Sequence, residues 1–203
     1  TIFFCGRFEP RKGLEVLLGA MKHLPANFAL WIAADGPGID EMHKLYENDH
    51  RISWLGRITE TDKLDRLSRC NVFCAPSLRG ESFGIVLLEA MAAAVPLVTT
   101  DIDGYRNVAT HEVNALLVAP GDEEQLANSI TRIVNDTNLS QRLVAGGLKR
   151  AEDFSMRRLA TEYVAIYERL LAAEKNNEIA VQPNRLLAMF EHRVLRRPQV
   201  GQN

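Results

Sequence analysis

The sequence has 203 residues, 46% of them hydrophobic and 25% charged, and its 24 Lys and Arg against 26 Asp and Glu give a formal net charge of −2. These values are typical of a globular domain with a sizeable core, and they exclude a protein that coats nucleic acid, because such a protein needs a basic face. The longest apolar stretch, residues 85–98, contains a glutamate and a proline and is too short to span a bilayer.

Short apolar runs alternate with amphipathic stretches through most of the chain. The chain begins inside the first run without an initiator Met, so we expect it to be a fragment that another domain precedes. Strands are predicted at Ile2–Cys5, Ala29–Ala33, Ile52–Leu55, Val72–Ala75, Leu97–Thr100 and Leu116–Val118. Helices are predicted between and after them at Leu14–Leu24, Ile39–Glu47, Thr61–Cys70, Phe83–Ala94 and Tyr105–Ala109. This alternation predicts an α/β fold, a Rossmann-like doubly wound parallel sheet of six strands.

After the sixth strand the pattern becomes all-helical. Asp122 and Gln125 have the spacing of a capping box, which predicts a helix at Glu123–Asn135. Two more helices are predicted at Leu139–Glu152 and Met156–Ala173, so the folded domain is expected to cover residues 1–173.

Residues 174–203 differ in composition and are predicted to form a polar linker and a basic amphipathic tail, Arg185–Arg197. A basic amphipathic helix could lie on an anionic membrane surface as a peripheral contact. The alternatives are a mobile tail and a helix that packs on a partner domain.

The three cysteines, Cys5, Cys70 and Cys74, are an odd number and lie in or beside apolar runs. This placement predicts buried thiols in a reducing, cytoplasmic compartment rather than a disulfide framework. The five histidines show no metal-ligand spacing, so no zinc site is expected.

The loop after the first predicted strand carries three cations, Arg7, Arg11 and Lys12, between two glycines. It has neither the glycine pattern of a dinucleotide-binding loop nor the ending of a P-loop. Cations at the start of a helix oppose the helix dipole, so they indicate a bound anion. The alternative is that these charges are simply solvated.

The loop after the fourth predicted strand reads Gly-Glu-Ser-Phe-Gly and leads into an apolar helix. Ser82 is predicted to cap this helix, and Gly84 would leave backbone amides open to a pyrophosphate. Glu81 and Glu89 bracket that anion site, where each could accept hydroxyl hydrogen bonds from one sugar of a nucleotide sugar. In the alternative, Glu81 is only a first-turn acid and Glu89 a partly exposed helix residue.

The glutamate pair resembles the E-x7-E motif of retaining GT-B glycosyltransferases of family 4, and the similarity covers residues 1–172. Within that family, the segments GRFEPRKGLEVLL, GESFGIVLLEAMAA and TDIDGYRNV are most similar to bacterial phosphatidylinositol α-mannosyltransferases. The resemblance also includes Gly6-Arg7, Lys12-Gly13, Asp35-Gly36-Pro37, Leu55-Gly56, Ala75-Pro76-Ser77 and the Asp101–Asp103 loop. The sequence departs from the family pattern at Ala34 and Ala94, where glycine is common.

The resemblance implies the donor-binding, C-terminal half of such an enzyme, metal-independent and without a cofactor, with GDP-mannose as donor. A phosphatidylinositol-type lipid would be bound through an N-terminal domain that this chain lacks, at the inner face of the plasma membrane, so the chain alone is expected to be inactive. It implies catalytic roles for Arg7 and Lys12, which would hold the diphosphate, and for Glu81, which would hold the hexose. The further donor-binding residues are Ser82, Phe83, Gly84 and Ile85 around the diphosphate and Glu89 at the ribose.

Guanine is the expected base, contacted by Ile58, Glu60 and Lys63 after the third predicted strand. One carboxylate can accept both N1–H and N2–H of guanine, whereas O6 and N7 accept from a cation. The resembling mannosyltransferases carry an acid and a lysine at these positions. The alternative is a first-turn acid beside a solvated lysine.

Two other functions remain open from the sequence. One is a family 4 enzyme that uses a UDP-hexose in polysaccharide synthesis, and the other is a non-catalytic Rossmann-like binding module. A receiver-type module would need an acidic cluster where this chain has Cys5-Gly6-Arg7, and a dehydrogenase would need the absent glycine pattern.

Overall fold

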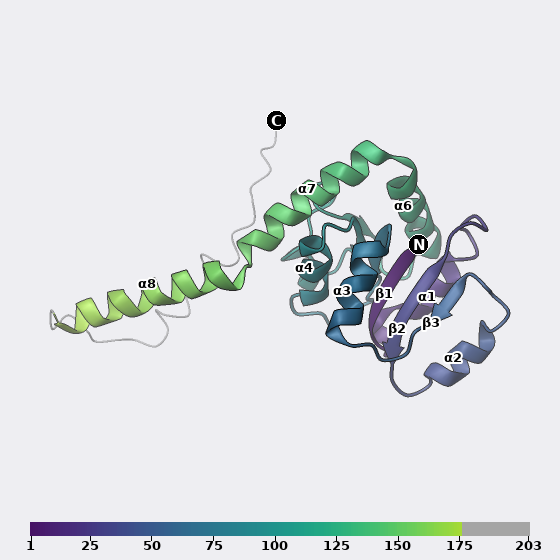
Figure 1. Ribbon diagram of the computed structural model, residues 1–203, viewed down its shortest axis with the longest axis horizontal. Helices are drawn as coiled ribbons and strands as arrows, with labels where there is room; N and C mark the ends of the chain where they lie inside the picture. Colours follow the sequence, from purple (N-terminus) through teal and green to yellow (C-terminus); the bar gives the residue numbers. More distant parts are fainter. Residues whose placement is uncertain (176–203) are drawn as a thin grey trace. The chain divides into compact units, whose positions relative to one another are not determined.

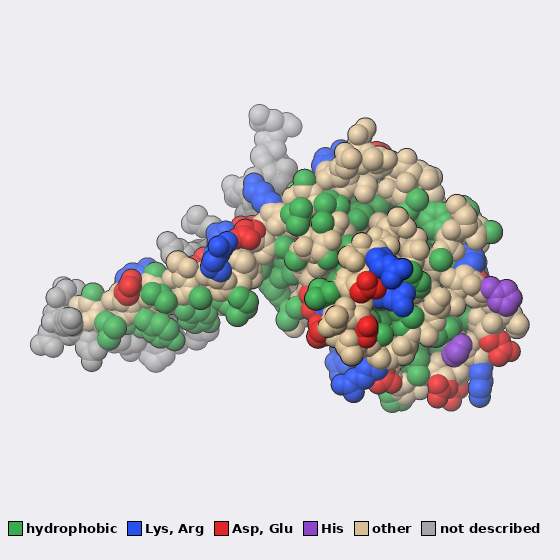
Figure 2. Space-filling model, in the orientation of Figure 1, with side chains coloured by type: hydrophobic (Ala, Val, Ile, Leu, Met, Phe, Trp, Pro, Cys, Tyr) green, Lys and Arg blue, Asp and Glu red, His purple; other side chains and the backbone are tan. Residues whose placement is uncertain are grey.

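The computed structural model describes residues 1–175, which fall into two compact units that divide after Asp153. The second unit begins at Phe154 and contains one described helix, α8 (Met156–Lys175). Several apolar side chains of α8, among them Met156 and Leu171, are exposed (Figure 2). The predicted tail, Arg185–Arg197, lies outside the described residues.

Six parallel strands form one sheet in the order β3-β2-β1-β4-β5-β6 (Figure 1). The strands are β1 (Ile2–Arg7), β2 (Leu30–Asp35), β3 (Ile52–Trp54), β4 (Val72–Ala75), β5 (Leu97–Thr100) and β6 (Leu116–Val118). The chain runs outward from β1 to β3 and then returns to place β4 on the other side of β1. The strand order therefore reverses between β1 and β4, which is where open α/β sheets bind ligands at their carboxyl ends. The predicted fold class is confirmed.

Helices cover both faces of this sheet (Figure 1). They are the 3-10 helix η1 (Pro10–Lys12), α1 (Leu14–Ala20), α2 (Ile39–Leu45), α3 (Glu60–Arg69), α4 (Ile85–Ala92), α5 (Asp103–Arg106), α6 (Glu123–Asn135) and α7 (Thr137–Asp153). Successive strand residues point to opposite faces, so Phe4 packs with Leu17 of α1, whereas Phe3 packs with Leu87 of α4. Both cores are apolar, which explains why the strands are apolar on both faces.

The helix α6 has the bounds that the capping pattern predicted, although the capping box is only half formed. The Asp122 carboxylate accepts a hydrogen bond from the Gln125 backbone N–H at 2.8 Å. The Gln125 side chain instead accepts from the Ala119 backbone N–H at 2.6 Å and so fixes the loop before the helix.

The helix α4 starts later than predicted, because Gly84 rather than Ser82 is its N-cap. Gly84 has φ 86 and makes no side-chain cap, and Ser82 is exposed in the preceding loop. A Cβ atom at Gly84 would lie 2.7 Å from Cδ1 of Tyr105, so the position excludes any side chain. A left-handed residue does not fit inside a right-handed helix, so α4 begins only after Gly84.

The end of α4 is a Schellman motif with an unusual residue. The backbone N–H of Val95 bonds to the Ala90 carbonyl at 3.0 Å, and that of Ala94 bonds to the Met91 carbonyl at 3.1 Å. Ala94 has φ 57, in the left-handed region that favours glycine.

Both tryptophans lie on the β2–β3 side of the sheet. The Arg66 guanidinium of α3 stacks over the Trp31 ring, with 4.6 Å from Cζ to the ring centroid. The Trp54 ring of β3 lies 5.2 Å from the His43 ring of α2, centroid to centroid.

Candidate functional site

The loops after β1 and β4 are in contact at the point where the strand order reverses. Gly13, with φ 69, ends η1, and a Cβ atom there would lie only 2.0 Å from the Pro76 carbonyl oxygen. This contact holds the cationic loop against the β4 loop. It places Arg11 and Lys12 beside Glu81, although some 70 residues separate them in the chain.

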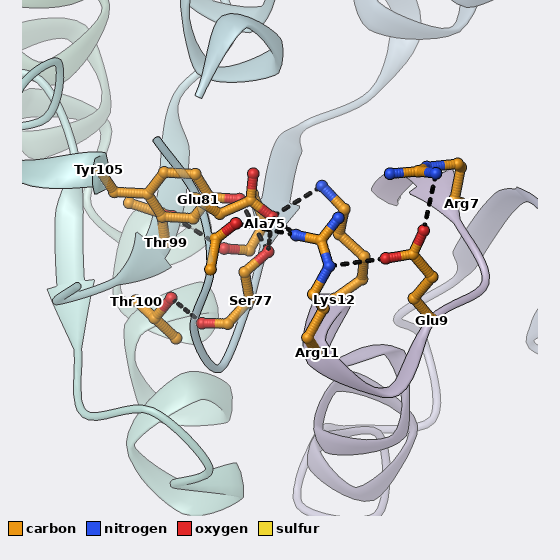
Figure 3. A network of polar contacts seen from close by, with 11 residues as sticks. Arg7, Glu9, Arg11, Lys12, Ala75, Ser77, Glu81, Thr99, Thr100 and Tyr105 are labelled. Atoms are coloured by element: carbon orange, nitrogen blue, oxygen red, sulfur yellow. Dashed lines mark hydrogen bonds and ion pairs between the residues drawn. The ribbon is translucent and has the colours of Figure 1, made fainter. Parts of the chain in front are cut away.

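Glu81 is the centre of this contact (Figure 3). Its Oε1 atom accepts from Lys12 Nζ at 2.7 Å, from Arg11 Nη1 at 3.1 Å and from Ser77 Oγ at 3.1 Å. No donor among residues 1–175 reaches its Oε2 atom. The side chain is 11% exposed. The carboxylate is thus held through Oε1 by the described residues.

Arg11 is one of the three loop cations noted in the sequence, but the resemblance gave it no donor-binding role, and the structure places it against Glu81. Its guanidinium bonds to Glu9 at 2.6 Å through Nε and to the Gly80 carbonyl at 3.1 Å through Nη1. It therefore ties the two loops together. The fold of η1 decides which cation of the loop faces Glu81, and the spacing of charges alone does not reveal this.

Arg7 takes a different direction. Its Nη1 atom pairs with Glu9 Oε1 at 3.0 Å, and 73% of its side chain is exposed (Figure 3). The structure thus brings together Lys12 and Glu81, two of the predicted donor-binding residues, and leaves Arg7 outside their contact. A diphosphate role for Arg7 stays a prediction.

A second polar cluster joins α3 to α4. Lys63 Nζ lies 2.7 Å from Glu60 Oε2 and 2.9 Å from Glu89 Oε1. Burial alone would lower the pKa of Lys63, but hydrogen bonds to the two carboxylates outweigh it and raise the pKa above its usual range. The predicted base-binding and ribose-binding residues are therefore linked by one ammonium, with Ile58 partly buried against the neighbouring apolar core.

The N-terminus of α4 lies between Glu81 of the first cluster and Glu89 of the second in the sequence. The first backbone amides of a helix, here including that of Ile85, have no partner within the helix, and α4 has no acidic side chain in its first turn. Glu81 precedes the helix, so the alternative that it is a first-turn acid is wrong. Phe83 is partly buried and Ile85 is exposed beside this terminus.

Surface charge on the visible face is mixed, with basic and acidic side chains side by side (Figure 2). Within residues 1–175, no His, Cys, Asp and Glu side chains gather in the threes that a metal ion would need. Over the same residues, no helix combines the length and apolar character needed to cross a bilayer.

The fold and the strand order define a Rossmann-like domain of the kind found in GT-B glycosyltransferases. The family model described as glycosyl transferases group 1 matches residues 1–150, and the chain belongs to this family.

The chain is also similar to curated glycosyltransferases. The chain is 32% identical over 184 residues to a phosphatidyl-myo-inositol mannosyltransferase of Mycobacterium leprae, covering 89% of this chain and 49% of the relative. A lipopolysaccharide core biosynthesis glycosyltransferase, LpsD of Rhizobium meliloti, is 32% identical over 171 residues, which covers 82% of this chain and 49% of the relative. The chain thus spans about half the length of the curated relatives it matches.

Solved structures agree on the fold. Sucrose-phosphate synthase from Thermosynechococcus elongatus superposes with a TM-score of 0.75 at 30% identity, covering 85% of this chain and 45% of that chain. Anabaena HepE, solved in complex with UDP, gives a TM-score of 0.75 at 22% identity, covering 83% and 48% of the two chains.

Proposed function

We propose that this chain is the donor-binding part of a metal-independent, retaining mannosyltransferase that takes mannose from GDP-mannose to a phosphatidylinositol-type lipid. The mannosyltransferase names of relatives at 32% identity support the choice of sugar and acceptor. The acceptor would be held by a domain outside this chain, at the cytoplasmic membrane face, with peripheral membrane contact.

One observation carries the proposal: Arg11 and Lys12 of η1 meet Glu81, which directly precedes α4, where the strand order of the sheet reverses. In the proposed complex, Lys12, Arg7 and the amides of Phe83, Gly84 and Ile85, with the Ser82 loop, bind the diphosphate. These groups stabilise the charge that develops on the leaving diphosphate, because fixed donors need no reorganisation during the reaction.

In the proposed complex, Glu81 and Glu89 each bind one sugar of the donor. The Oε2 atom of Glu81 accepts hexose hydroxyl hydrogen bonds, and Glu89 accepts those of the ribose. Glu81→Gln should then lower turnover in a two-domain enzyme while GDP affinity stays within about twofold, whereas Glu89→Ala should weaken GDP itself. Equal loss of GDP affinity in both variants would mean that these two roles are wrongly assigned.

The base is proposed to be guanine. The Lys63 ammonium has three donors, of which two face Glu60 and Glu89, so one is left for guanine O6 or N7. Glu60 is 84% exposed, so its carboxylate can accept the two donors of guanine while Ile58 packs on the ring.

Calorimetric titration of the chain with GDP, UDP, ADP and NAD tests the proposal. We expect GDP to bind tightest and Glu60→Ala to lower the GDP-to-UDP affinity ratio by at least several-fold, because bidentate base recognition is worth about 1–3 kcal/mol. Asp65→Ala is the matched control, since Asp65 is a half-exposed acid on the same helix that pairs only with Arg69 among the described residues. A ratio that Glu60→Ala leaves unchanged would count against guanine.

The second candidate is a UDP-hexose-dependent enzyme of polysaccharide or lipopolysaccharide synthesis. The similarity to LpsD at the same 32% identity favours it. Preference for UDP in the titration would select it over the mannosyltransferase.

A further inference from the structure

Tyr105 is linked to the Glu81 carboxylate through Ser77 (Figure 3). The tyrosine is 1% exposed, and its hydroxyl is 2.8 Å from Ser77 Oγ, which in turn is 3.1 Å from Glu81 Oε1. Ser77 is itself 2% exposed, so water does not replace either contact. These three side chains form a buried relay that ends on the carboxylate.

The available protons decide which group donates in each hydrogen bond of the relay. The Glu81 carboxylate only accepts, so the single hydroxyl proton of Ser77 is donated to it. The Tyr105 hydroxyl must then donate to Ser77, and each bond polarises the next. Burial raises the pKa of Tyr105 above its usual value, so the phenol keeps its proton and remains a donor.

The short helix α5 also contacts the Glu81 loop through its backbone. A Cβ atom at Gly104 would lie 1.7 Å from the Glu81 carbonyl oxygen and 3.2 Å from the Ser82 nitrogen. The Tyr105 ring fills the space at Gly84, the N-cap of α4, where a Cβ atom would lie 2.7 Å from Cδ1. Tyr105 thus contacts both Ser77, which donates to the Glu81 carboxylate, and Gly84, the N-cap of α4.

We infer that Tyr105 is a positioning residue for the sugar donor: its hydroxyl orients Glu81 through Ser77, and its ring fixes the start of α4. The inference rests on the proposed function, because it assigns Glu81 to the hexose and the helix end to the diphosphate. The two parts of Tyr105 should then have separable effects: the hydroxyl should affect binding of the hexose, and the ring should affect binding of the diphosphate.

The test compares GDP with GDP-mannose in calorimetric titrations of the chain. Tyr105→Phe keeps the ring, so GDP affinity should stay within about twofold, whereas the affinity gained from the mannose should fall by roughly three- to tenfold, the effect of one hydrogen bond. Ser77→Ala should give the same loss, and the double variant should lose no more than either single one. Tyr105→Leu, which removes the ring, should weaken GDP as well.

Thr99→Val is the control for a merely structural effect. Thr99 is fully buried in the neighbouring strand β5, and its hydroxyl donates to the Ala75 carbonyl at 2.8 Å without contacting Glu81. Loss of the Thr99 hydroxyl should lower the melting temperature, as Tyr105→Phe should. It should leave unchanged the affinity that GDP-mannose gains over GDP from the mannose. An unchanged mannose contribution in Tyr105→Phe, or an equal loss in Thr99→Val, would overturn the inference.

A ligand-free measurement separates this inference from the proposed function. In urea unfolding, the shifts in midpoint caused by Tyr105→Phe and Glu81→Gln should be less than additive, since both break one relay. If the wild-type chain binds no nucleotide, the proposed function fails and this cycle still decides whether Tyr105 orders Glu81. Additive shifts would overturn the inference.

Discussion

At the residue scale, the charged side chains of the site already have partners before any donor binds. Lys12 pairs with Glu81, and Lys63 pairs with Glu60 and Glu89. In the proposed complex, a diphosphate would share Lys12 with the Glu81 carboxylate. Arg11 and Ser77 also donate to Glu81, so the carboxylate would keep hydrogen bonds if Lys12 bound the diphosphate.

Lys12→Ala should weaken nucleoside diphosphate binding by roughly tenfold to a hundredfold, because a hydrogen bond to a charged group contributes about 1.5–3 kcal/mol. Nucleoside binding should change far less, since a nucleoside carries no phosphate. Calorimetry with GDP and guanosine measures both effects. Lys22→Ala, at an exposed lysine that follows α1, is the control, and equal losses for GDP and guanosine would contradict the diphosphate role.

At the element scale, α5 matters because it supports the Glu81 loop, and an ion pair fixes it. The Arg106 guanidinium bonds to Asp101 Oδ1 at 2.6 Å and to Oδ2 at 2.9 Å, and this contact lowers the pKa of Asp101 below its ordinary 3.8. A lowered carboxyl pKa stabilises the fold above the ordinary value and loses that effect as the pH falls through the folded value.

Asp101→Asn should therefore destabilise the chain at pH 7 but make progressively less difference below about pH 4. Urea unfolding of both proteins between pH 7 and pH 3 measures the difference. Asp103→Asn is the control, because the Asp103 side chain is 98% exposed and should contribute less. A difference that stays constant with pH would contradict the ion-pair account.

Ala94→Gly should stabilise the chain by up to about 1 kcal/mol. Ala94 has φ 57, and the left-handed conformation costs a non-glycine residue about 1–2 kcal/mol, part of which the extra freedom of an unfolded glycine offsets. Ala93→Gly, one residue earlier at φ −79, should instead destabilise by about 0.5–1 kcal/mol. Chemical denaturation of both variants checks the opposite signs, and the same sign in both would exclude strain at Ala94.

Sequence patterns predicted the elements well where local chemistry decides them. The Asp122 cap gave the bounds of α6, and the apolar runs gave all six strands. The predicted start of α4 was wrong because Gly84 has a left-handed φ of 86 and ends the loop there, which the sequence alone does not reveal. Arg11 was recognised as a loop cation, but its contact with Glu81 was not predicted, since the two residues are 70 positions apart in the chain.

The candidate site shows the same division. Periodicity and charge located the two loops, and the family resemblance assigned roles to their residues. The relay through Ser77 and Tyr105 joins side chains 28 residues apart, and no local pattern distinguishes a tyrosine that packs from one that also donates. Those contacts depend on the tertiary fold.

At the scale of the whole molecule, the chain covers about half of its curated relatives. We expect the purified chain to bind the donor but not to transfer sugar, because closing an active site excludes water and orients the acceptor, which is worth several orders of magnitude in rate. Transfer to a phosphatidylinositol acceptor is measured beside a two-domain relative. Comparable rates would show that this chain already holds a complete active site.

The placement of the two tryptophans makes one edge of the sheet optically distinct. Trp31 and Trp54 lie on the adjacent strands β2 and β3 and pack toward the two opposite apolar cores, whereas α4 to α7 contain no indole. Intrinsic fluorescence thus reports the melting of the β2–β3 edge, and far-ultraviolet circular dichroism reports the helices of the whole chain. Superimposed curves from the two probes would mean that this edge and the site at β1 and β4 unfold as one cooperative unit.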